Sequence, residues 1–216
     1  LDIGGTMIKA GIISEAGHIM VSGETPTEAK KGADYVLNKV RDLIEEYSKT
    51  HTFAGICIST AGMVDDKNGT ILYANDNLPG YTGINVKKYL EEIFQIPVEV
   101  ENDAMCAGLS EVFCGAGKGS KITLCLTIGT GIGGCIIIDN KLFHGFNSGA
   151  GEIGYMKMFD SDFQSLASTS ALVNKVSGMK GIPESELNGI EIFRMAKAGD
   201  KLCREAIEDM CDKIGY

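Results

Sequence analysis

The stretch Leu1–Thr6 reads Leu-Asp-Ile-Gly-Gly-Thr, a short apolar strand that ends in a glycine turn. The same pattern returns at Leu126–Gly131 as Leu-Thr-Ile-Gly-Thr-Gly, an offset of 125 residues (126 minus 1). A second apolar segment follows the glycines in each copy, Met7–Ile13 in the first and Cys135–Ile138 in the second. This order predicts a β-hairpin in each place. Two such hairpins predict two halves of similar topology with a ligand between them.

Both glycine turns are candidate phosphate-binding sites. A turn of this kind exposes backbone N–H groups, and the missing Cβ of glycine lets a phosphate approach closely. Asp2 stands beside the first turn and would repel phosphate unless Mg²⁺ lies between them, bound directly or through water. Lys9 adds a positive charge nearby. The alternative is a pair of ordinary hairpins with structural glycines, and the recurrence of the pattern weighs against it.

Between the two hairpins, Val100–Cys106 reads Val-Glu-Asn-Asp-Ala-Met-Cys, and Asp103 lies where an apolar strand passes into a helix. An Asp at such a place is commonly a helix N-cap. A hydroxyl that attacks a γ-phosphate, however, needs a positioned carboxylate to accept its proton and little further covalent help. Asn102 and Glu152 are further polar groups for such a site. From the residues alone, the cap and the general base both remain open for Asp103.

The remaining segments predict an α/β protein. Apolar residues at a period of 3.6 predict an amphipathic helix over residues 34–47, and a buried strand follows at Phe53–Ser59. A strand, a helix and a strand in this order imply parallel pairing through a crossover. A long loop is expected over Thr60–Gly83, followed by a helix over Val86–Phe94 and a strand over Pro97–Glu101.

A glycine-rich segment, Gly115–Ser120, is the expected domain boundary, which gives an N-terminal domain over residues 1–114 and a C-terminal domain over residues 115–216. Both ends of the chain look cut. The first strand is shorter than the usual strand of about 5–6 residues, and Tyr216 falls inside a helical pattern. We therefore expect a piece of a longer protein, truncated at both ends.

The composition limits the class of protein. With 216 residues, 44% of them hydrophobic, and a net charge of −9, the chain resembles a globular protein and lacks the basic surface that nucleic-acid binding needs. No stretch approaches the ~18 apolar residues of a membrane span. Seven cysteines without a CxxC pair indicate free thiols in a reducing compartment. We therefore expect a cytoplasmic protein with neither membrane nor nucleic-acid partners.

Four segments together resemble the ROK family: Asp2–Thr6, Glu101–Ala104, Gly129–Gly134 and Glu152–Gly154. That family contains sugar kinases and related repressors with the actin-like (ribonuclease H-like) ATPase fold, and the resemblance covers nearly the whole chain. It implies duplicated actin-like domains with an interdomain cleft. It also implies an enzyme that uses ATP and Mg²⁺ to phosphorylate a sugar.

The resemblance further implies roles for individual residues. By it, Asp103 is the base that deprotonates the sugar hydroxyl, usually O6 of a hexose. The residues that match sugar-binding positions are Gly62, Asn77, Asn102, Asp103 and Glu152. Those that match phosphate-binding positions are Gly4, Gly5, Thr6, Lys9, Thr130 and Gly131. Asp2 matches the position near Mg²⁺, bound directly or through water.

The sequence departs from the family pattern at three points. Tyr155 stands where the family usually has His, and Met156–Gln164 lacks the cysteines of the zinc loop that normally follows. Structural zinc needs four nitrogen or sulfur ligands, so we expect no zinc site. Gln164 stands where the family has a sugar-contacting Glu. Tyr155 and Gln164 can still donate and accept hydrogen bonds, which keeps both as candidate sugar contacts with an altered pattern.

These departures leave the sugar open among a β-glucoside, N-acetylmannosamine and glucose, and we favour the β-glucoside because zinc-free kinases of that kind resemble this chain. A sugar-responsive repressor of the same family is the alternative; its DNA-binding segment would precede Leu1 and is absent from this sequence. A non-catalytic sugar sensor is disfavoured because Asp103 and both glycine turns are intact. We expect the full-length protein to be a homodimer that binds a small-molecule sugar.

Overall fold

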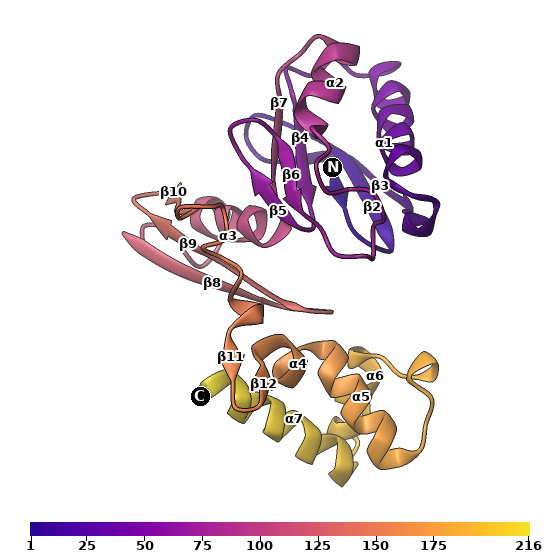
Figure 1. Cartoon of the computed structure of the whole chain (residues 1–216), viewed down its shortest axis with the longest axis vertical. Helices are drawn as coiled ribbons and strands as arrows, with labels where there is room; N and C mark the ends of the chain where they lie inside the picture. Colours follow the sequence, from indigo (N-terminus) through magenta and orange to yellow (C-terminus); the bar gives the residue numbers. More distant parts are fainter. The chain divides into compact units, whose positions relative to one another are not determined.

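The computed structural model describes residues 1–216, and it is α/β throughout (Figure 1). The chain divides into two compact units. The first comprises Leu1–Cys106 with Gly145–Gly149, and the second comprises Ala107–His144 with Ala150–Tyr216. The boundary after Cys106 lies inside a helix that ends at Cys114, the last residue of the N-terminal domain expected from the sequence. The division into functional domains at residues 114 and 115 stays a proposal.

The first unit is built on a five-stranded sheet of order β3-β2-β1-β4-β7. Its antiparallel part consists of β1 (Asp2–Ile3), β2 (Met7–Ile13) and β3 (Ile19–Pro26). β4 (Ile56–Thr60) pairs parallel with β1, and β7 (Val98–Asn102) pairs parallel with β4. The structure thus confirms the hairpin predicted at the first glycine turn and the parallel pairing predicted from the strand–helix–strand order.

Two amphipathic helices pack on this sheet, α1 (Ala33–Ser48) against β2 and α2 (Val86–Phe94) against β7 (Figure 1). In α1, the fully buried Val36, Val40 and Ile44 recur every fourth residue and therefore lie on one face. Asn85 is the N-cap of α2, and its side chain accepts a hydrogen bond of 2.7 Å from the Lys88 N–H. A side-chain cap of this kind satisfies one of the free N–H groups of the first turn.

The connection between β4 and α2 is more ordered than the long loop expected over Thr60–Gly83, so that expectation is wrong in part. β5 (Met63–Asp65) and β6 (Thr70–Tyr73) form a two-stranded antiparallel sheet. Tyr81 is buried, and its hydroxyl shares a hydrogen bond of 3.0 Å with that of Thr60. Burial raises the pKa of Tyr81 to about 12. Strands of three or four residues are too short to show an alternating pattern in the sequence.

The second unit contains a three-stranded sheet of order β10-β9-β8, formed by β8 (Ile122–Ile128), β9 (Ile132–Ile138) and β10 (Lys141–Leu142). β8 and β9 are antiparallel, with Ile128 opposite Ile132, which confirms the second predicted hairpin. Most of α3 (Asp103–Cys114) belongs to this unit. A Cβ on Gly108 would collide with the Cys135 Sγ, so glycine is what allows α3 to approach β9.

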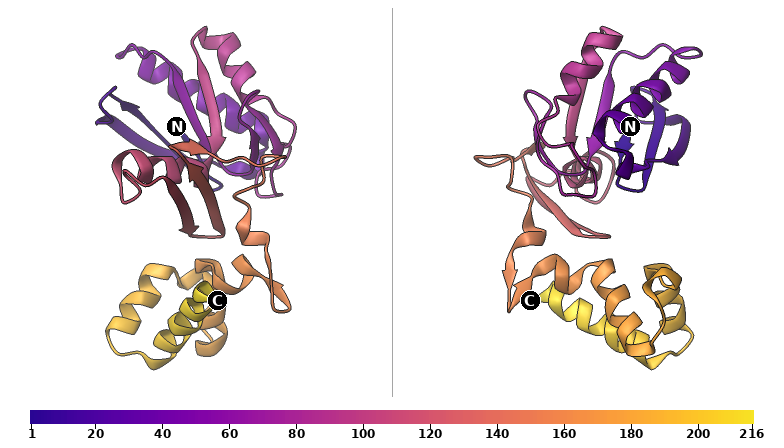
Figure 2. Two further views of the ribbon diagram at one scale, coloured as in Figure 1. Left: turned by 90° about the vertical axis from the view of Figure 1, so that its left-hand side faces the viewer. Right: turned by 45° about the vertical axis from the view of Figure 1, so that its right-hand side comes forward.

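The rest of the second unit is mainly helical, and its helices gather in one bundle (Figure 2). Its buried core includes Leu172, Val176, Ile192 and Ala206.

Within the chain as a whole, no helix combines the length and the apolar character that a membrane span needs. The elements not yet named are η1 (Ala29–Lys31), η2 (Ile153–Tyr155), β11 (Lys157–Met158), β12 (Ser161–Asp162), α4 (Phe163–Ala167), α5 (Thr169–Lys180), η3 (Glu184–Glu186), α6 (Gly189–Lys197) and α7 (Lys201–Gly215).

Candidate active site

The three parallel strands of the first unit place polar residues in one row near their carboxyl ends. The register pairs Asp2 with Ser59 and Ser59 with Glu101. One step further along β7, the strand ends at Asn102 and α3 begins at Asp103. In open α/β sheets, ligands bind at the carboxyl ends of parallel strands. The sheet therefore carries Asp2 and Asp103 to the end where a ligand is expected.

Asn102 caps α3. Its Oδ1 accepts hydrogen bonds from the N–H groups of Ala104, at 2.9 Å, and Met105, at 3.1 Å. Asp103 is the first helical residue. Its Oδ1 accepts a hydrogen bond of 2.8 Å from the Ala104 N–H, and its carboxyl also accepts from the Asn102 side chain and from its own N–H. The question left open by the sequence is thus answered: the cap is Asn102. The second carboxylate oxygen of Asp103 is not needed to begin the helix.

The surroundings of Asp103 favour a proton acceptor. Its side chain reaches solvent, yet the partial burial of its carboxyl raises the pKa of Asp103 above the usual value, and the negative charge of Asp2 raises it further. The hydrogen bond from the Ala104 N–H opposes this rise without cancelling it. A carboxylate with a raised pKa holds an abstracted proton better than an ordinary Asp does.

Of the expected sugar-binding residues, the first unit brings two together. The Asn102 Nδ2 donates a hydrogen bond of 2.9 Å to the carbonyl of Gly62. Gly62 has φ +101°, and a Cβ there would lie 2.5 Å from the Tyr73 carbonyl oxygen, so only glycine fits. Asn77 is exposed, and its N–H donates to the Asn75 Oδ1 at 3.1 Å. Asn102 and Gly62 therefore have structural roles that their motif positions did not reveal.

Asp2 lies in a small polar cluster. Its Oδ1 accepts a hydrogen bond of 2.8 Å from the Ser59 hydroxyl. Burial, and next the charge of Glu101, raise the pKa of the nearby Cys106 thiol to about 11.

No group of three or more His, Cys, Asp and Glu side chains could hold a metal ion. Mg²⁺ usually binds one or two carboxylates together with phosphate oxygens and water, and a single Asp2 carboxylate fits that mode.

The first glycine hairpin leaves backbone donors open. Gly4 is part of the turn, its N–H donating to the Met7 carbonyl at 3.1 Å. Gly5 and Thr6 are exposed, and the protein offers no acceptor for the Gly5 N–H. Lys9 is an exposed cation directly opposite Asp2 in the register of β1 and β2. An open N–H donor with a nearby cation has the chemistry of a phosphate site.

The second hairpin stands at the N-terminus of α5. The Thr169 N–H donates to the Gly129 carbonyl at 2.8 Å, and the Gly129 N–H closes the turn by donating to the Gly131 carbonyl at 2.9 Å. Thr130 is exposed, and its N–H has no acceptor in the protein. The positive end of a helix dipole favours anions at such a place.

The candidate sugar contacts of the second unit lie around η2. Glu152 precedes this short helix, and Tyr155 ends it with an exposed ring. The Gln164 side chain lies against two backbone segments, because a Cβ on Gly131 would be 2.8 Å from its Oε1 and one on Gly154 would be 3.2 Å away. Gln164 is thus next to the second hairpin. Met156–Gln164, where the family places its zinc loop, forms the β11–β12 hairpin and the start of α4.

Sequence reasoning missed the residues that support these sites. Ser59 holds Asp2, and Thr27 hydrogen-bonds both ends of the first glycine turn. Neither belongs to a motif, and each is a hydroxyl residue in a segment expected to be a strand end or a loop. The one usable signal is register, because pairing β3 with β2 brings Thr27 opposite Thr6.

Comparisons with known proteins agree with this architecture. A sequence model of the ROK family matches residues 1–216. An uncharacterised protein of Clostridium perfringens is 48% identical over 99% of this chain and 72% of its own length. A β-glucoside kinase of Listeria monocytogenes is 32% identical over 96% of this chain and 72% of its own length.

A solved structure extends the comparison to the fold. The ROK family glucokinase of Streptomyces griseus, in complex with glucose and AMPPNP, superimposes with a TM-score of 0.84 at 29% identity, covering 99% of this chain and 75% of its own. This similarity confirms the actin-like ATPase fold that the resemblance implied. The chain belongs to the ROK family.

Proposed function

We propose that this protein transfers the γ-phosphate of ATP to a hydroxyl, O6, of a hexose or hexose derivative. The observation that carries the proposal is the Asp103 carboxyl, which has a raised pKa and does not serve as the helix cap, since Asn102 does. Phosphoryl transfer asks mainly for a positioned nucleophile and for donors that stabilise the phosphates. The described residues include candidates for both.

In this proposal Asp103 accepts the proton of the sugar hydroxyl as that oxygen attacks the γ-phosphorus. The phosphates are bound by the open N–H groups of Gly5 and Thr130, with Gly4, Thr6, Lys9 and Gly131 as the other residues of this set. Asp2 would hold Mg²⁺, and the ion, when bound, neutralises phosphate charge. Ser59 orients the Asp2 carboxylate through its hydrogen bond.

The sugar is proposed to contact Gly62, Asn77, Asn102, Glu152, Tyr155 and Gln164. Three hydrogen bonds of the Asn102 amide go to the backbone, and its side chain also donates to the Asp103 carboxylate, so Asn102 would hold the base beside the sugar. Tyr155 and Gln164 lie in the segments that depart from the family pattern, and they are the candidates to select the sugar. We favour a β-glucoside such as cellobiose over N-acetylmannosamine and glucose, and the similarity to a β-glucoside kinase supports this choice.

The proposal also keeps the expectations of a cytoplasmic homodimer without structural zinc. All seven cysteines are free thiols, as expected in a reducing compartment. Metal analysis of the purified protein should find no stoichiometric zinc, and a full equivalent would overturn the interpretation of Tyr155 and the segment after it.

The direct test is ADP release by the purified protein with cellobiose, N-acetylmannosamine, glucose and fructose. The proposal expects turnover with at least one of these sugars and its loss in Asp103→Asn. If no hexose supports ADP release above the ATP-only background, the proposed activity is wrong. If the Asp103→Asn variant keeps wild-type turnover on the best sugar, the assignment of the base is wrong.

A further inference from the structure

Thr27 is a buried polar residue that the catalytic scheme does not yet use. It follows the last residue of β3, Pro26, which pairs with Met7. The side chain of Thr27 is fully buried, whereas its two neighbours in the sequence, Pro26 and Glu28, are exposed. A buried hydroxyl needs a hydrogen-bond partner, and here the partner belongs to the first glycine hairpin.

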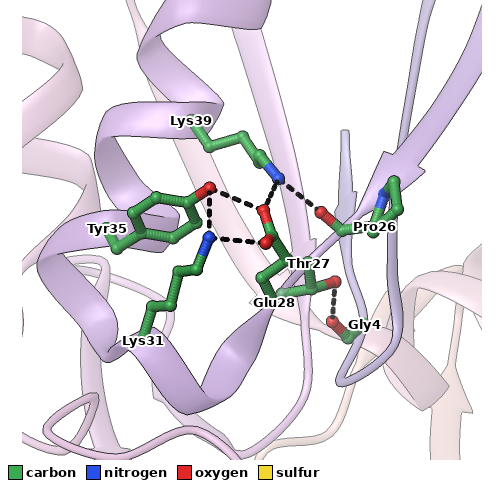
Figure 3. A network of polar contacts seen from close by, with 7 residues as sticks. All are labelled: Gly4, Pro26, Thr27, Glu28, Lys31, Tyr35 and Lys39. Carbon is green, nitrogen blue, oxygen red and sulfur yellow. Dashed lines mark hydrogen bonds and ion pairs between the residues drawn. The ribbon is translucent and has the colours of Figure 1, made fainter.

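Thr27 contacts that hairpin at two points. Its Oγ1 donates a hydrogen bond of 2.6 Å to the carbonyl of Gly4, and its N–H donates one of 2.8 Å to the carbonyl of Thr6 (Figure 3 shows the first of these). The two carbonyls flank Gly5. One residue therefore fixes the peptide on each side of the exposed tip of the turn.

The contact with Gly4 also sets the direction of a donor. In a planar trans peptide the C=O and the N–H point in opposite directions. When Thr27 holds the Gly4 carbonyl, the N–H of Gly5 in the same peptide is turned away from Thr27. Gly5 is exposed, and its N–H has no acceptor in the protein. The bond to Thr27 thus keeps one open donor pointing out of the hairpin.

Thr27 is itself held from both sides by α1. The Lys39 ammonium donates to the Pro26 carbonyl at 2.6 Å and to the Glu28 carboxylate at 2.8 Å (Figure 3). Glu28 also accepts from Lys31 and from the Tyr35 hydroxyl, the latter at 2.6 Å. The hydrogen bonds from Lys31, Lys39 and Tyr35 lower the pKa of Glu28 to about 2, so this carboxylate stays charged at every pH of interest.

The backbone of Glu28 explains why so many contacts meet there. Glu28 has φ +54°, the left-handed conformation that a residue with a side chain seldom adopts. Such a conformation persists only where surrounding contacts over-determine it. The turn at Glu28 directs the chain from β3 into η1 and α1, and it leaves Thr27 against the hairpin.

We propose that Thr27 is a positioning residue for the ATP phosphates, which orients the Gly5 N–H through the Gly4 peptide and is held in place by the Lys39–Glu28 pair. This inference rests on the proposed function, because it assigns the hairpin to ATP. Thr27 touches neither ATP nor sugar. Its effect is confined to the nucleotide side of the reaction.

The test compares Thr27→Val, which removes the hydroxyl and keeps the branched shape, with Thr27→Ser, which keeps the hydroxyl. Steady-state kinetics are measured with ATP and with the best sugar varied in turn. We expect Thr27→Val to raise the KM for ATP roughly 3- to 10-fold, the effect of one lost hydrogen bond, with the KM for sugar within about twofold of wild type. Thr27→Ser should return the KM for ATP to within about twofold of the wild-type value.

A second variant covers the case in which Thr27→Val does not fold. Lys39→Met removes the hydrogen bonds that Lys39 donates to residues 26 and 28 and leaves those of Lys31 and Tyr35 to Glu28. It should raise the KM for ATP selectively and by a smaller factor. Lys49→Met is the matched control, because Lys49, at the C-terminal end of the same helix, forms its ion pair with Glu46 and has no contact with the hairpin segment.

The outcomes separate the two proposals. Absence of ADP release by the wild-type protein with every hexose would refute the proposed function itself. Wild-type turnover with an unchanged KM for ATP in Thr27→Val, or an equal rise in both KM values, would refute the positioning role alone. An ATP-selective rise that is rescued in Thr27→Ser supports it.

Discussion

The two glycine hairpins hold equivalent positions in the repeat, but different groups support them. Gly4 and Gly129 are 125 residues apart (129 minus 4). Each has a carbonyl that accepts a hydrogen bond from outside the hairpin, from the Thr27 hydroxyl at 2.6 Å in the first case and from the Thr169 N–H at 2.8 Å in the second. By peptide planarity the following N–H is turned outward in both hairpins.

This difference shows what the two halves have in common. They share the direction of an N–H group rather than the residue that directs it. The first support is a side chain and can be removed by one conservative substitution. The second is the backbone of a helix N-terminus, and only proline at position 169 would remove it. Variants of the two hairpins and of Asp103 can therefore separate effects on ATP binding from effects on the proton-transfer step.

The largest effect is expected at Asp103, since neither hairpin can replace a proton acceptor. Asp103→Asn should lower kcat by about 10²- to 10⁴-fold, the usual contribution of a general base. The KM for ATP should change little, because the Gly5 and Thr130 N–H groups are untouched. Steady-state kinetics with ATP and sugar varied separately provide the measurement, and a rise in the KM for ATP with an unchanged kcat would contradict it.

The two leading glycines should differ in stability when each is replaced by alanine. A Cβ on Gly4 would lie 2.9 Å from the Met7 carbonyl oxygen, whereas a Cβ on Gly129 meets nothing within 4 Å. Gly4→Ala should therefore destabilise the fold by about 1–2 kcal/mol, and Gly129→Ala by less than about 0.5 kcal/mol. Chemical denaturation of both variants measures the difference, and equal losses would show that the first turn is not tighter than the second.

The backbone support of the second hairpin is tested by Thr169→Pro. Proline is well tolerated at the first position of a helix, and here it removes only the N–H that holds the Gly129 carbonyl. We expect a roughly 3- to 10-fold rise in the KM for ATP, comparable with that of Thr27→Val. Thr169→Ala keeps the N–H and is the control. If proline and alanine act alike at this position, the support is not the backbone bond.

The smallest expected effect is a shift along the pH axis. Because burial raises the pKa of Asp103, kcat/KM should fall on the acid side at a pH above the ordinary Asp value of about 3.9. Asp103 must be deprotonated to act as a base, so activity is lost as the pH falls through this raised pKa. If kcat/KM falls only at or below the ordinary Asp value, the environment described for Asp103 is contradicted.

The raised pKa of Asp103 also makes the stability of the protein depend on pH. With a native pKa above the unfolded one, the native state binds more protons in the window between the two values, so stability decreases as the pH rises through that window. The charged carboxylate then makes the native state less stable at neutral pH. The melting temperature of Asp103→Asn relative to wild type should therefore be higher at pH 7 than at pH 4. Thermal unfolding at both pH values checks this.

Much of the fold followed from local sequence pattern. The glycines at residues 4–5 and 129–131 predicted two hairpins because a turn between apolar strands leaves a short-range signature, and both hairpins are present. The strand–helix junction at Asp103 was likewise visible. By contrast, β5 and β6 lie in a segment for which the sequence predicts a loop, since strands of three and four residues are too short for their pattern to be recognised.

The candidate site was predictable where it consists of motif residues, and not where it depends on pairing. The sequence left Asp103 open as a helix cap or a general base, because an adjacent Asn can cap a helix equally well and only the bonds from Ala104 and Met105 to Asn102 identify the cap. Thr27 belongs to none of the motifs. Its role depends on the register of β3 with β2, a contact between segments that no local pattern encodes.

The thiol of Cys106 has a practical consequence. With a pKa of about 11 it is almost entirely protonated at neutral pH, and thiol reagents react with the thiolate. Three other cysteines, Cys57, Cys114 and Cys211, are exposed and should be alkylated first. Once these and Cys125, which is half-buried like Cys106, are replaced by serine, the alkylation rate of Cys106 reports local opening of the strand–helix junction that carries Asp103. A sugar that binds at this junction should lower the alkylation rate of Cys106, and this change would report binding without any turnover.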